Sequence, residues 1–352
     1  MLNIALLGCG RIAVRHAQLL SSGEVNGAHL TAVCDTMPDK AALFGQKYKV
    51  PYYTNLYEMI QRHPEIDAVS ILTPSGMHAQ HTVEVARLKK HVIVEKPMAL
   101  TLDDADTMIH ECDRNGVRLF VIKQNRFNVP VVKLREALEK GRFGKLVMGT
   151  VRVRWCRTQE YYKQDGWRGT WKLDGGVLTN QASHHVDLLH WMMGDVLSVY
   201  AVARTALADI ETEDTAAVVL RFRSGALGII EATTACRPKD LEGSISILGE
   251  KGSVEIGGFA VNEMKTWAFT EVVPEDKEVV EKFSVNPPNV YGFGHKAYYE
   301  HVIDCIENRH HALVDGLEGR ASLELISAIY ESIETGREVQ LRFNPQRCKL
   351  GH

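Results

Sequence analysis

The sequence predicts an α/β protein: an N-terminal doubly wound parallel sheet, followed by an α+β domain with a mostly antiparallel, open sheet. The chain of 352 residues is longer than one hydrophobic core usually serves. Its first half alternates short apolar runs with helical patterns, whereas its second half carries longer runs rich in Val and Arg. We therefore predict one domain over residues 1–125 and a second over residues 126–352, whose terminal helices can pack back on the first.

The first domain follows from five apolar runs of strand length that alternate with helices. The runs cover residues 3–7, 30–35, 67–73, 91–95 and 117–122, and the helical patterns cover 12–20, 40–48, 77–89 and 102–115. Apolar strands between helices are typical of a parallel sheet with both faces covered. Right-handed crossovers then put a ligand at the carboxyl ends of the strands.

The second domain is predicted from strands of a different kind. These strands cover residues 147–156, 196–204, 215–223, 244–248 and 253–256, and residues 223–226 form a hairpin turn. One helix over 177–193 interrupts the strands, and two helices over 294–307 and 316–335 end the chain. The break between the domains is expected within residues 124–149.

Composition excludes several classes of function. The net charge of −3 provides no general attraction for nucleic acid. The seven cysteines are odd in number and scattered, which argues against a disulfide framework and for a reducing compartment. No apolar run approaches the roughly 18 residues of a membrane span. We therefore expect a cytoplasmic protein without nucleic-acid or membrane partners.

A glycine turn lies between the first strand and the first helix. Gly8 permits a tight turn, and Gly10 lets backbone N–H groups approach a pyrophosphate, with Arg11 and Ile12 opening the helix. Ala13 takes the place of the usual third glycine, where close helix packing tolerates it. The helix N-terminus offers N–H donors and positive partial charge to phosphates. An ordinary turn is the alternative, but this position favours a Rossmann dinucleotide site.

Asp35 ends the second strand, where a carboxylate can accept hydrogen bonds from both ribose hydroxyls. Because a carboxylate repels a 2′-phosphate and no Arg follows it, we predict NAD rather than NADP. The third strand ends in a loop that is also expected to line the cofactor, and the alternative is a plain connection with a serine N-cap. The predicted cofactor residues in this loop are Thr73, Pro74, Ser75 and His78.

Glu95 and Lys96 follow a buried strand and precede Pro97, at the catalytic edge of the sheet. Most lysines are solvated surface charges. A lysine beside an oxidised nicotinamide would feel a second positive charge and partial burial, which both lower its pKa. Lys96 is therefore a candidate catalytic, cofactor-binding and substrate-binding residue, and Glu95 a candidate cofactor contact.

The segment after Gly175-Gly176 carries polar residues at helical spacing. Asn180, His184 and Asp187 fall at i, i+4 and i+7, which share one face of a helix. A buried, hydrogen-bonded polar patch is the alternative to an active site. The adjacent histidines His184 and His185 point about 100° apart and make a poor chelating pair, so no metal is expected.

Glu95-Lys96-Pro97, the glycine turn and the His184 segment together resemble the Gfo/Idh/MocA oxidoreductases, from residue 3 to about residue 343. The resemblance implies a Rossmann domain, a second domain whose open sheet often mediates oligomers, and a catalytic pair corresponding to Lys96 and His184. It also implies a cis bond before Pro97. Many members carry Asp where this chain has Asn180, so proton transfer falls to Lys96 and His184 alone.

Further motifs resemble the branch that oxidises UDP-linked sugar acids, the UDP-N-acetyl-2-amino-2-deoxyglucuronate 3-dehydrogenases. These motifs cover residues 122–127, 178–185, 291–299 and 315–323. The resemblance implies NAD-dependent oxidation of the sugar C3 hydroxyl for surface polysaccharide, such as lipopolysaccharide. It suggests 2-oxoglutarate as a hydride acceptor, Gln124 as a cofactor contact, and a homo-oligomer, either tetramer or dimer.

A pyrophosphate and a uronate need cationic contacts, and arginine suits both because it binds them bidentately. An exposed loop of mixed charge is the alternative for the basic and aromatic cluster near residues 157–168. The predicted substrate-binding residues, besides Lys96, are Arg157, Tyr161, Arg168, Asn180, Gln181, His184 and His185.

Three other functions fit parts of this pattern. A dehydrogenase of inositol or a free hexose needs no cationic cluster. A catalytically silent NAD-binding regulator would keep Asp35 but need not keep Lys96 with His184. A sugar-nucleotide binding module without redox chemistry would not need the glycine turn.

Overall fold

The computed structural model describes residues 1–284, 292–341 and 348–351. Its contacts divide the chain into two compact units. The first unit comprises residues 1–122 and 295–321, and the second comprises residues 123–294 and 322–352. The division therefore falls three residues before the expected boundary, and it assigns 295–321 to the first unit. Tyr291 is the first residue of one predicted motif, and Phe343 is where the resemblance ends. Both lie outside the described residues.

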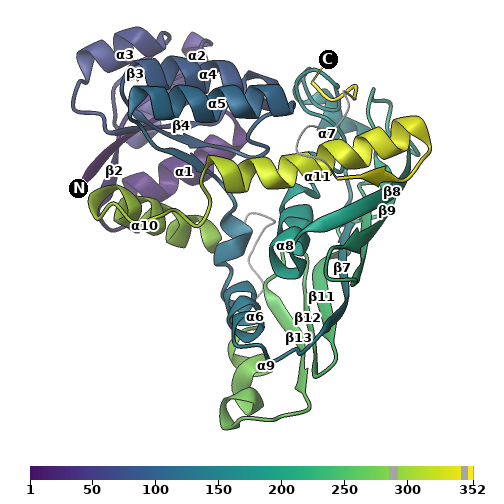
Figure 1. The fold of residues 1–352 in the computed structure, drawn as a ribbon. Coiled ribbons are helices and arrows are strands. Elements are labelled where there is room, and N and C mark those ends of the chain that lie inside the picture. Colours follow the sequence, from purple (N-terminus) through teal and green to yellow (C-terminus); the bar gives the residue numbers. More distant parts are fainter. Residues whose placement is uncertain (285–291, 342–347, 352) are drawn as a thin grey trace. The chain divides into compact units, whose positions relative to one another are not determined.

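The first unit contains a six-stranded, fully parallel sheet in the order β3-β2-β1-β4-β5-β6 (Figure 1). This order reverses direction between β1 and β4, which is the switch point where ligands bind in such sheets. The strands are β1 (Leu2–Leu7), β2 (Ala28–Cys34), β3 (Tyr52–Tyr53), β4 (Ala68–Ile71), β5 (His91–Val94) and β6 (Leu119–Val121).

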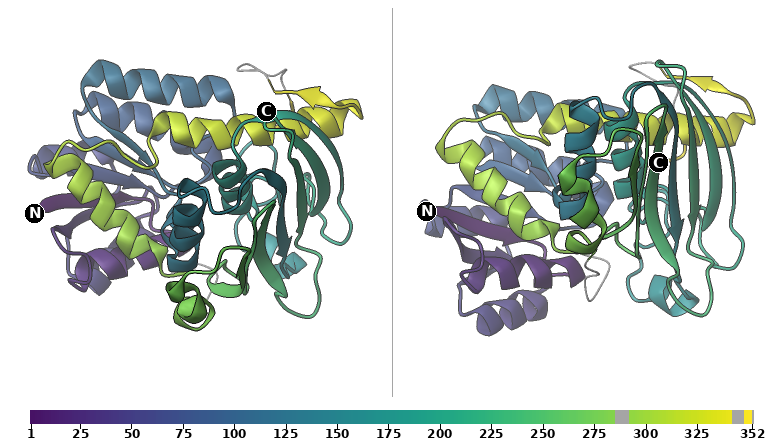
Figure 2. Two further views of the ribbon diagram at one scale, coloured as in Figure 1. Left: turned by 60° about the horizontal axis from the view of Figure 1, so that its bottom comes forward. Right: turned by 90° about the horizontal axis from the view of Figure 1, so that it is seen from below.

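Helices cover both faces of this sheet. In Figures 1 and 2, α4 and α5 lie on one face, and α1 and α10 lie on the other. Local signals set the helix ends: the Thr101 hydroxyl accepts from the Asp104 N–H at the start of α5, and Gly116 ends that helix with φ of 68°. The helices are α1 (Arg11–Ser21), α2 (Pro38–Tyr48), α3 (Leu56–Arg62), α4 (His78–Arg87), α5 (Leu102–Asn115) and α10 (Gly294–Glu307).

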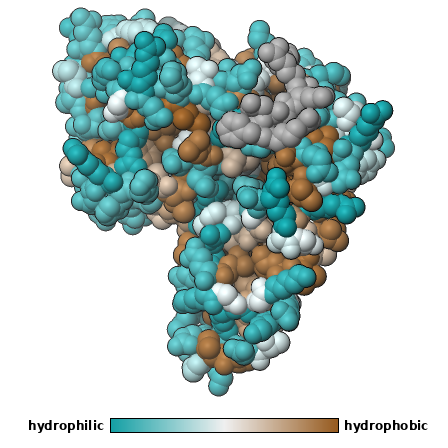
Figure 3. Space-filling view, viewed as in Figure 1, coloured by the Kyte–Doolittle hydropathy of each residue, from teal (hydrophilic) through white to brown (hydrophobic). Residues whose placement is uncertain are grey.

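The outward surface of the helices in the first unit is mostly hydrophilic in the view of Figure 3. This is expected for amphipathic helices that bury one stripe against a sheet. In residues 1–284, 292–341 and 348–351, every helix is too short or too polar to cross a membrane.

The second unit contains an eight-stranded sheet in the order β13-β12-β11-β7-β10-β9-β8-β14. Among the described strands of this sheet, only β7 and β10 pair in parallel, and the predicted fold class is confirmed. The hairpin at Gly225 joins β9 and β10, also as predicted. The strands are β7 (Leu146–Arg154), β8 (Val196–Arg204), β9 (Thr215–Phe222), β10 (Leu227–Thr233), β11 (Glu242–Gly249), β12 (Gly252–Gly257), β13 (Glu263–Phe269) and β14 (Val339–Gln340).

One face of this sheet packs against α8 (Ser183–Met193), which lies over β7 and β11 (Figure 1). The helix comes so close that a Cβ at Gly149 would stand 2.7 Å from side-chain atoms of Leu189 and Met193. The opposite face exposes apolar side chains that are neighbours in the strand register, including Tyr200 and Val219. The remaining helices are α6 (Val129–Glu139), α7 (Gln159–Lys163), α9 (Val279–Lys282) and α11 (Gly316–Thr335).

The second half differs from expectation in two details. The helix predicted over 177–193 begins at Ser183, and the residues before it form turns, so Asn180 precedes the helix that carries His184. No helix was predicted in the region expected to hold the domain break, and the structure has α6 there, with Pro130 in its first turn, where proline suits a helix start.

Candidate active site

The glycine turn after β1 has the geometry that a pyrophosphate requires. Gly8 has φ of +102°, and a Cβ there would stand 2.9 Å from the Leu72 carbonyl, so only glycine fits. A Cβ at Gly10 would meet nothing within 4 Å, and no side chain caps α1, which begins at Arg11 and continues with Ile12. The uncapped N–H groups and the open space beside them fit a dinucleotide phosphate.

Asp35 follows β2 beside this turn. One carboxylate oxygen accepts from the Cys9 N–H and the other from the Met37 N–H, both at 2.8 Å. These bonds fix the orientation of the carboxylate, and each oxygen keeps a further lone pair. The residue can therefore hold two ribose hydroxyls in the way the sequence predicts.

The loop after β4 is tied to the loop after β5 by His78. The ring Nε2 lies 2.9 Å from the Thr73 carbonyl oxygen, and Nδ1 lies 2.8 Å from the Pro97 carbonyl oxygen. Burial lowers the pKa of His78, although both carbonyls favour the protonated ring. Pro74 precedes a short 3-10 turn that begins at the buried Ser75, so Ser75 does not act as an N-cap. The ring nitrogens of His78 therefore connect these two loops and fix their positions relative to each other.

Glu95 and Lys96 lie at the carboxyl end of β5, next to the switch point. The peptide bond between Lys96 and Pro97 is cis, as the resemblance implied. One oxygen of the buried Glu95 accepts from the Lys96 N–H at 3.0 Å, and the other lies 3.1 Å from His16 Nε2. Glu95 thus contacts protein groups on both of its oxygens.

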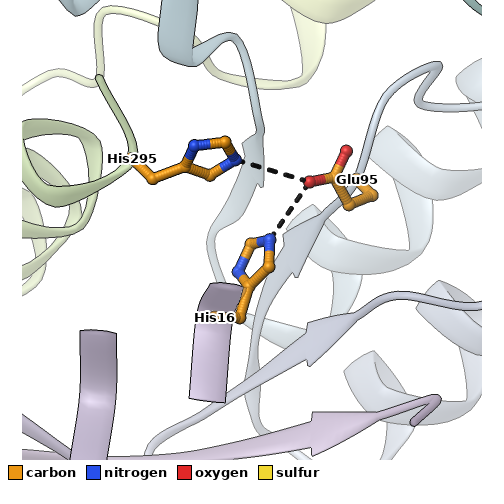
Figure 4. Close-up of side chains that lie close together, drawn as sticks. All are labelled: His16, Glu95 and His295. Carbon is orange, nitrogen blue, oxygen red and sulfur yellow. Dashed lines mark hydrogen bonds and ion pairs between the residues drawn. The ribbon is translucent and has the colours of Figure 1, made fainter. Parts of the chain in front are cut away.

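His16, Glu95 and His295 form a buried group that sequence reasoning missed (Figure 4). Their ligand atoms all lie within 4.8 Å of one another, which is close enough to hold a metal ion. Among the described residues, this is the group of three or more His, Cys, Asp or Glu side chains that meets that spacing. Its members come from α1, the end of β5 and the start of α10, so no local spacing could have indicated it.

In the second unit, His184 lies in the first turn of α8. Its Nε2 lies 2.9 Å from the side-chain amide nitrogen of Gln124. With the amide N–H₂ toward the ring, Nε2 accepts and a neutral ring carries its proton on Nδ1. The structure thus brings together a predicted catalytic histidine and a predicted cofactor residue that are 60 positions apart.

Asp187, one turn further along α8, is buried in an ion-pair network. Arg126 contacts it in a bidentate manner at 2.9 and 2.8 Å, and Lys123 Nζ lies 3.6 Å away. Burial opposes the charge of Asp187, but Arg126 and Lys123 outweigh it and lower the pKa of the carboxyl. Asp187 therefore stays ionised and fixes α8 against residues 123–126. The motif over residues 122–127 was the only sequence signal for these two cations.

Asn180, just before α8, donates from its side-chain amide to the buried carboxylate of Asp174. The other oxygen of Asp174 accepts from the Gly169 N–H at 2.8 Å. The Asn180 amide is therefore hydrogen-bonded to a carboxylate, that of Asp174, six positions earlier in the chain. Sequence reasoning missed Asp174 in this role because it assumed a helix at residue 180.

Glu213 lies buried beneath the same turn. Its Oε1 accepts from the Leu178 N–H at 3.0 Å and from the Tyr330 hydroxyl at 2.9 Å. Burial raises the pKa of Glu213 to about 7, although these hydrogen bonds act in the opposite direction. A Cβ at Gly176 would collide with this carboxyl group, so the glycine is required for close approach.

The raised pKa of Glu213 predicts a pH-dependent stability. Because the folded state holds this proton more tightly than the unfolded state, the stabilisation is complete below the unfolded value near 4.5 and is lost as pH rises through about 7. Glu213→Gln should therefore raise the melting temperature more at pH 8 than at pH 6. The gain in the free energy of unfolding should be roughly 1 kcal/mol larger at pH 8 than at pH 6. Calorimetry at both pH values measures this, and an equal change at both would contradict it. Asp165→Asn, at a half-exposed loop carboxylate, is the control.

Arg157, Tyr161 and Arg168 do cluster within the second unit. The guanidinium carbons of Arg157 and Arg168 lie 5.4 and 4.7 Å, respectively, from the centre of the Tyr161 ring. Arg157 also pairs with Asp240 at 2.9 Å, and Arg168 pairs with Asp165 at 3.0 Å. An anionic ligand would therefore share these arginines with existing carboxylates.

Gln181 and His185 are both buried. Burial lowers the pKa of His185 to about 4, so the ring is neutral, and it packs edge-on against Trp155 at 5.9 Å. Within the described part of the chain, neither of its ring nitrogens has a hydrogen-bond partner. The two adjacent histidines thus have different surroundings, as the helix geometry predicted.

The chain matches two family descriptions. Residues 2–123 match the oxidoreductase family, NAD-binding Rossmann fold, and residues 135–341 match the oxidoreductase family, C-terminal alpha/beta domain. Together they cover most of the chain. The chain therefore belongs to the Gfo/Idh/MocA oxidoreductases, and the fold, the family and the NAD cofactor expected from the sequence are confirmed.

Solved structures and curated relatives add detail. The WlbA dehydrogenase from Bordetella pertussis, in complex with NADH and UDP-GlcNAcA, is 42% identical with a TM-score of 0.90, over 97% of this chain and 98% of that one. The WlbA dehydrogenase from Chromobacterium violaceum, with the same two ligands, is also 42% identical with a TM-score of 0.90, over 98% and 97%. The myo-inositol 2-dehydrogenase of Thermotoga maritima is 30% identical over 97% of this chain and 98% of its own length. The protein is an NAD-dependent sugar dehydrogenase.

Proposed function

We propose that the protein oxidises the C3 hydroxyl of a UDP-linked N-acetylamino sugar uronic acid to the 3-keto sugar. The observation that carries this proposal is the 42% identity, over nearly the full length, to two dehydrogenases whose structures hold NADH and UDP-GlcNAcA. The cationic and aromatic cluster around Tyr161 supports a charged nucleotide sugar, because a free hexose would not need two arginines.

The chain's own residues divide the work. The turn at Gly8 and Gly10 receives the pyrophosphate, and Asp35 receives the adenosine ribose. Lys96 and His184 bind the C3 hydroxyl and one of them takes its proton, while NAD supplies the acceptor for the hydride. The Gln124 amide orients the His184 ring through Nε2 at 2.9 Å. Lys96 can be the base directly, whereas His184 can be the base only when the substrate hydroxyl takes the place of this amide at Nε2, because the other ring nitrogen of that tautomer carries the proton.

Oxidation of inositol is the second candidate, favoured by the 30% identity to the Thermotoga maritima enzyme. Mixing the protein with NAD and either UDP-GlcNAcA, UDP-N-acetylglucosamine or myo-inositol, and following absorbance at 340 nm, separates the two. We expect NADH only with the uronate, and a product two mass units lighter. Turnover of myo-inositol alone would overturn the proposal. No turnover of any of the three compounds would favour a catalytically silent NAD-binding protein.

The proposal extends to the setting of the reaction. The 3-keto sugar would serve surface polysaccharide, such as lipopolysaccharide, in the cytoplasm, and 2-oxoglutarate would reoxidise the bound cofactor. The exposed Tyr200, Val202 and Val219 on the open sheet face, which are 45%, 53% and 51% exposed, support a homo-oligomer, either dimer or tetramer. Light scattering after size-exclusion chromatography measures this, and a monomer at micromolar concentration would contradict it.

Substrate charge gives a further prediction, at Arg168. We expect Arg168→Ala to raise KM for the UDP-uronate by about 10-fold or more, because a charge-assisted hydrogen bond contributes roughly 1.5–3 kcal/mol. The affinity for UDP-N-acetylglucosamine, which lacks the sugar carboxylate and is measured as a competitive inhibitor, should fall less. Equal losses for both compounds would remove Arg168 from carboxylate recognition. Lys172→Ala, which removes an exposed cation four residues further along the chain, is the control.

A further inference from the structure

A chain of buried polar groups connects the first helix to the backbone of Lys96. His16 lies in α1, four residues after Ile12 of the glycine turn, and its Nε2 is 3.1 Å from Glu95 Oε1. His295, at the start of α10, places its own Nε2 4.0 Å from the same oxygen (Figure 4). The two imidazoles are fully buried, and Glu95 is 6% exposed.

The outer atoms of this group are also engaged. His16 Nδ1 lies 2.7 Å from the Tyr299 hydroxyl, which lies 2.8 Å from the Ser70 hydroxyl on β4. The second oxygen of Glu95 accepts from the Lys96 N–H. Because a carboxylate can only accept, His16 Nε2 must carry a proton, whichever form the ring takes. The helices α1 and α10 and the strand β4, which are distant in sequence, thus together fix the peptide bond between Glu95 and Lys96.

The carboxylate in this group is charged. Burial opposes ionisation, but the hydrogen bond from His16, the nearby imidazoles and the Lys96 ammonium outweigh it and lower the pKa of Glu95 to about 2. By the same attraction the carboxylate favours the protonated lysine. The other titratable groups that face it are His78 of α4 and Tyr298 and Tyr299 of α10.

The three side chains also meet the spacing for a metal. A divalent ion with one carboxylate would leave a net positive charge in a fully buried place, which is costly unless it is paired. The direct bond of 3.1 Å between His16 and Glu95 requires a proton on Nε2, which a metal would displace, and it therefore favours the hydrogen-bonded group over a metal site.

We propose that His16, Glu95 and His295 are positioning residues for Lys96: they hold its backbone and keep one negative charge beside its ammonium, and so set the pH at which the lysine can exchange a proton. This rests on the proposed role of Lys96 in the reaction. It links cofactor binding to proton transfer, because the helix that carries His16 also presents its N-terminus to the pyrophosphate.

The test measures the lysine directly in the protein without substrate. Lysines are methylated reductively with ¹³C, the Lys96 signal is assigned by its loss in Lys96→Met, and its pH titration is followed by NMR. We expect the titration of Lys96 to fall by at least about 0.5 pH unit in Glu95→Gln and in His16→Leu. His16→Gln, whose amide can still donate to the carboxylate, should retain the wild-type value. Glu111→Gln is the matched control, since Glu111 is also a buried, ion-paired carboxylate of the first unit.

Kinetics and metal content complete the experiment. The limb of the pH–rate profile that depends on Lys96 should move by the same amount, with kcat lowered about 10-fold and both KM values within several-fold. An unchanged titration in a folded Glu95→Gln protein would overturn the proposal while leaving the proposed function intact. One equivalent of bound metal in wild type, lost in His16→Leu, would also overturn it. Since Glu95→Gln can unfold, the pair His16→Gln and His16→Leu keeps the test decisive.

Discussion

Lys96→Met and His184→Asn should each lower kcat by about 100-fold or more, with NAD affinity unchanged within several-fold. The methionine keeps much of the side-chain length but loses both charge and proton affinity. The asparagine keeps a hydrogen-bonding group but cannot accept a proton near neutral pH. The measurement is single-turnover reduction of bound NAD, with cofactor affinity titrated in parallel.

The double mutant should be little worse than the worse single mutant, because residues that act as one unit are not additive. Lys90→Met is the matched control for the lysine, since Lys90 precedes β5 at the opposite end of the strand from Lys96. His190→Asn, on the same helix as His184, is the control for the histidine. Near-normal turnover in either single mutant would remove that residue from proton transfer, and loss of NAD binding in Lys96→Met would make the lysine a cofactor ligand instead.

Asp35→Ala should weaken NAD binding by roughly 10- to 100-fold and reduce the discrimination against NADP. The loss follows from charge-assisted hydrogen bonds, each worth about 1.5–3 kcal/mol. The alanine also removes the repulsion of a 2′-phosphate, so NADP should suffer much less than NAD. Fluorescence titration of both cofactors measures the two affinities.

Asp39→Ala is the control for this charge, because Asp39 lies in the first turn of α2, four residues further along, and is exposed. Since Asp35 also accepts from the Cys9 and Met37 N–H groups, Asp35→Asn separates loss of loop geometry from loss of charge. A wild-type preference for NADP would show that the ribose assignment is wrong.

Local patterns predicted most of the first unit correctly. Apolar runs of strand length, helical spacing and the glycine turn are properties of neighbouring residues, so β1, α1, β2, β5 and α5 appear within about two residues of where they were expected. Asp35 and Lys96 were chosen as candidate site residues in the same way, because the carboxyl end of a parallel strand is a position where ligands bind.

Prediction failed where chain direction depends on distant packing. The turns before α8 are held by Asp174 and Glu213, and Glu213 belongs to a segment more than thirty residues later; its contact with Leu178 spans 35 positions. Periodicity over residues 177–193 could not show that these carboxylates compete with helix formation by bonding to the backbone.

The sequence by itself therefore determined the fold class, the cofactor and two candidate catalytic residues, because each depends on a short stretch of chain. Only the tertiary structure decided what surrounds those residues. His16 meets Glu95 across 79 positions, and Gln124 meets His184 across 60. Such contacts form when separate helices and strands bury their apolar faces together, and a polar group enclosed by that packing must find its partner among whatever side chains the packing brings to it.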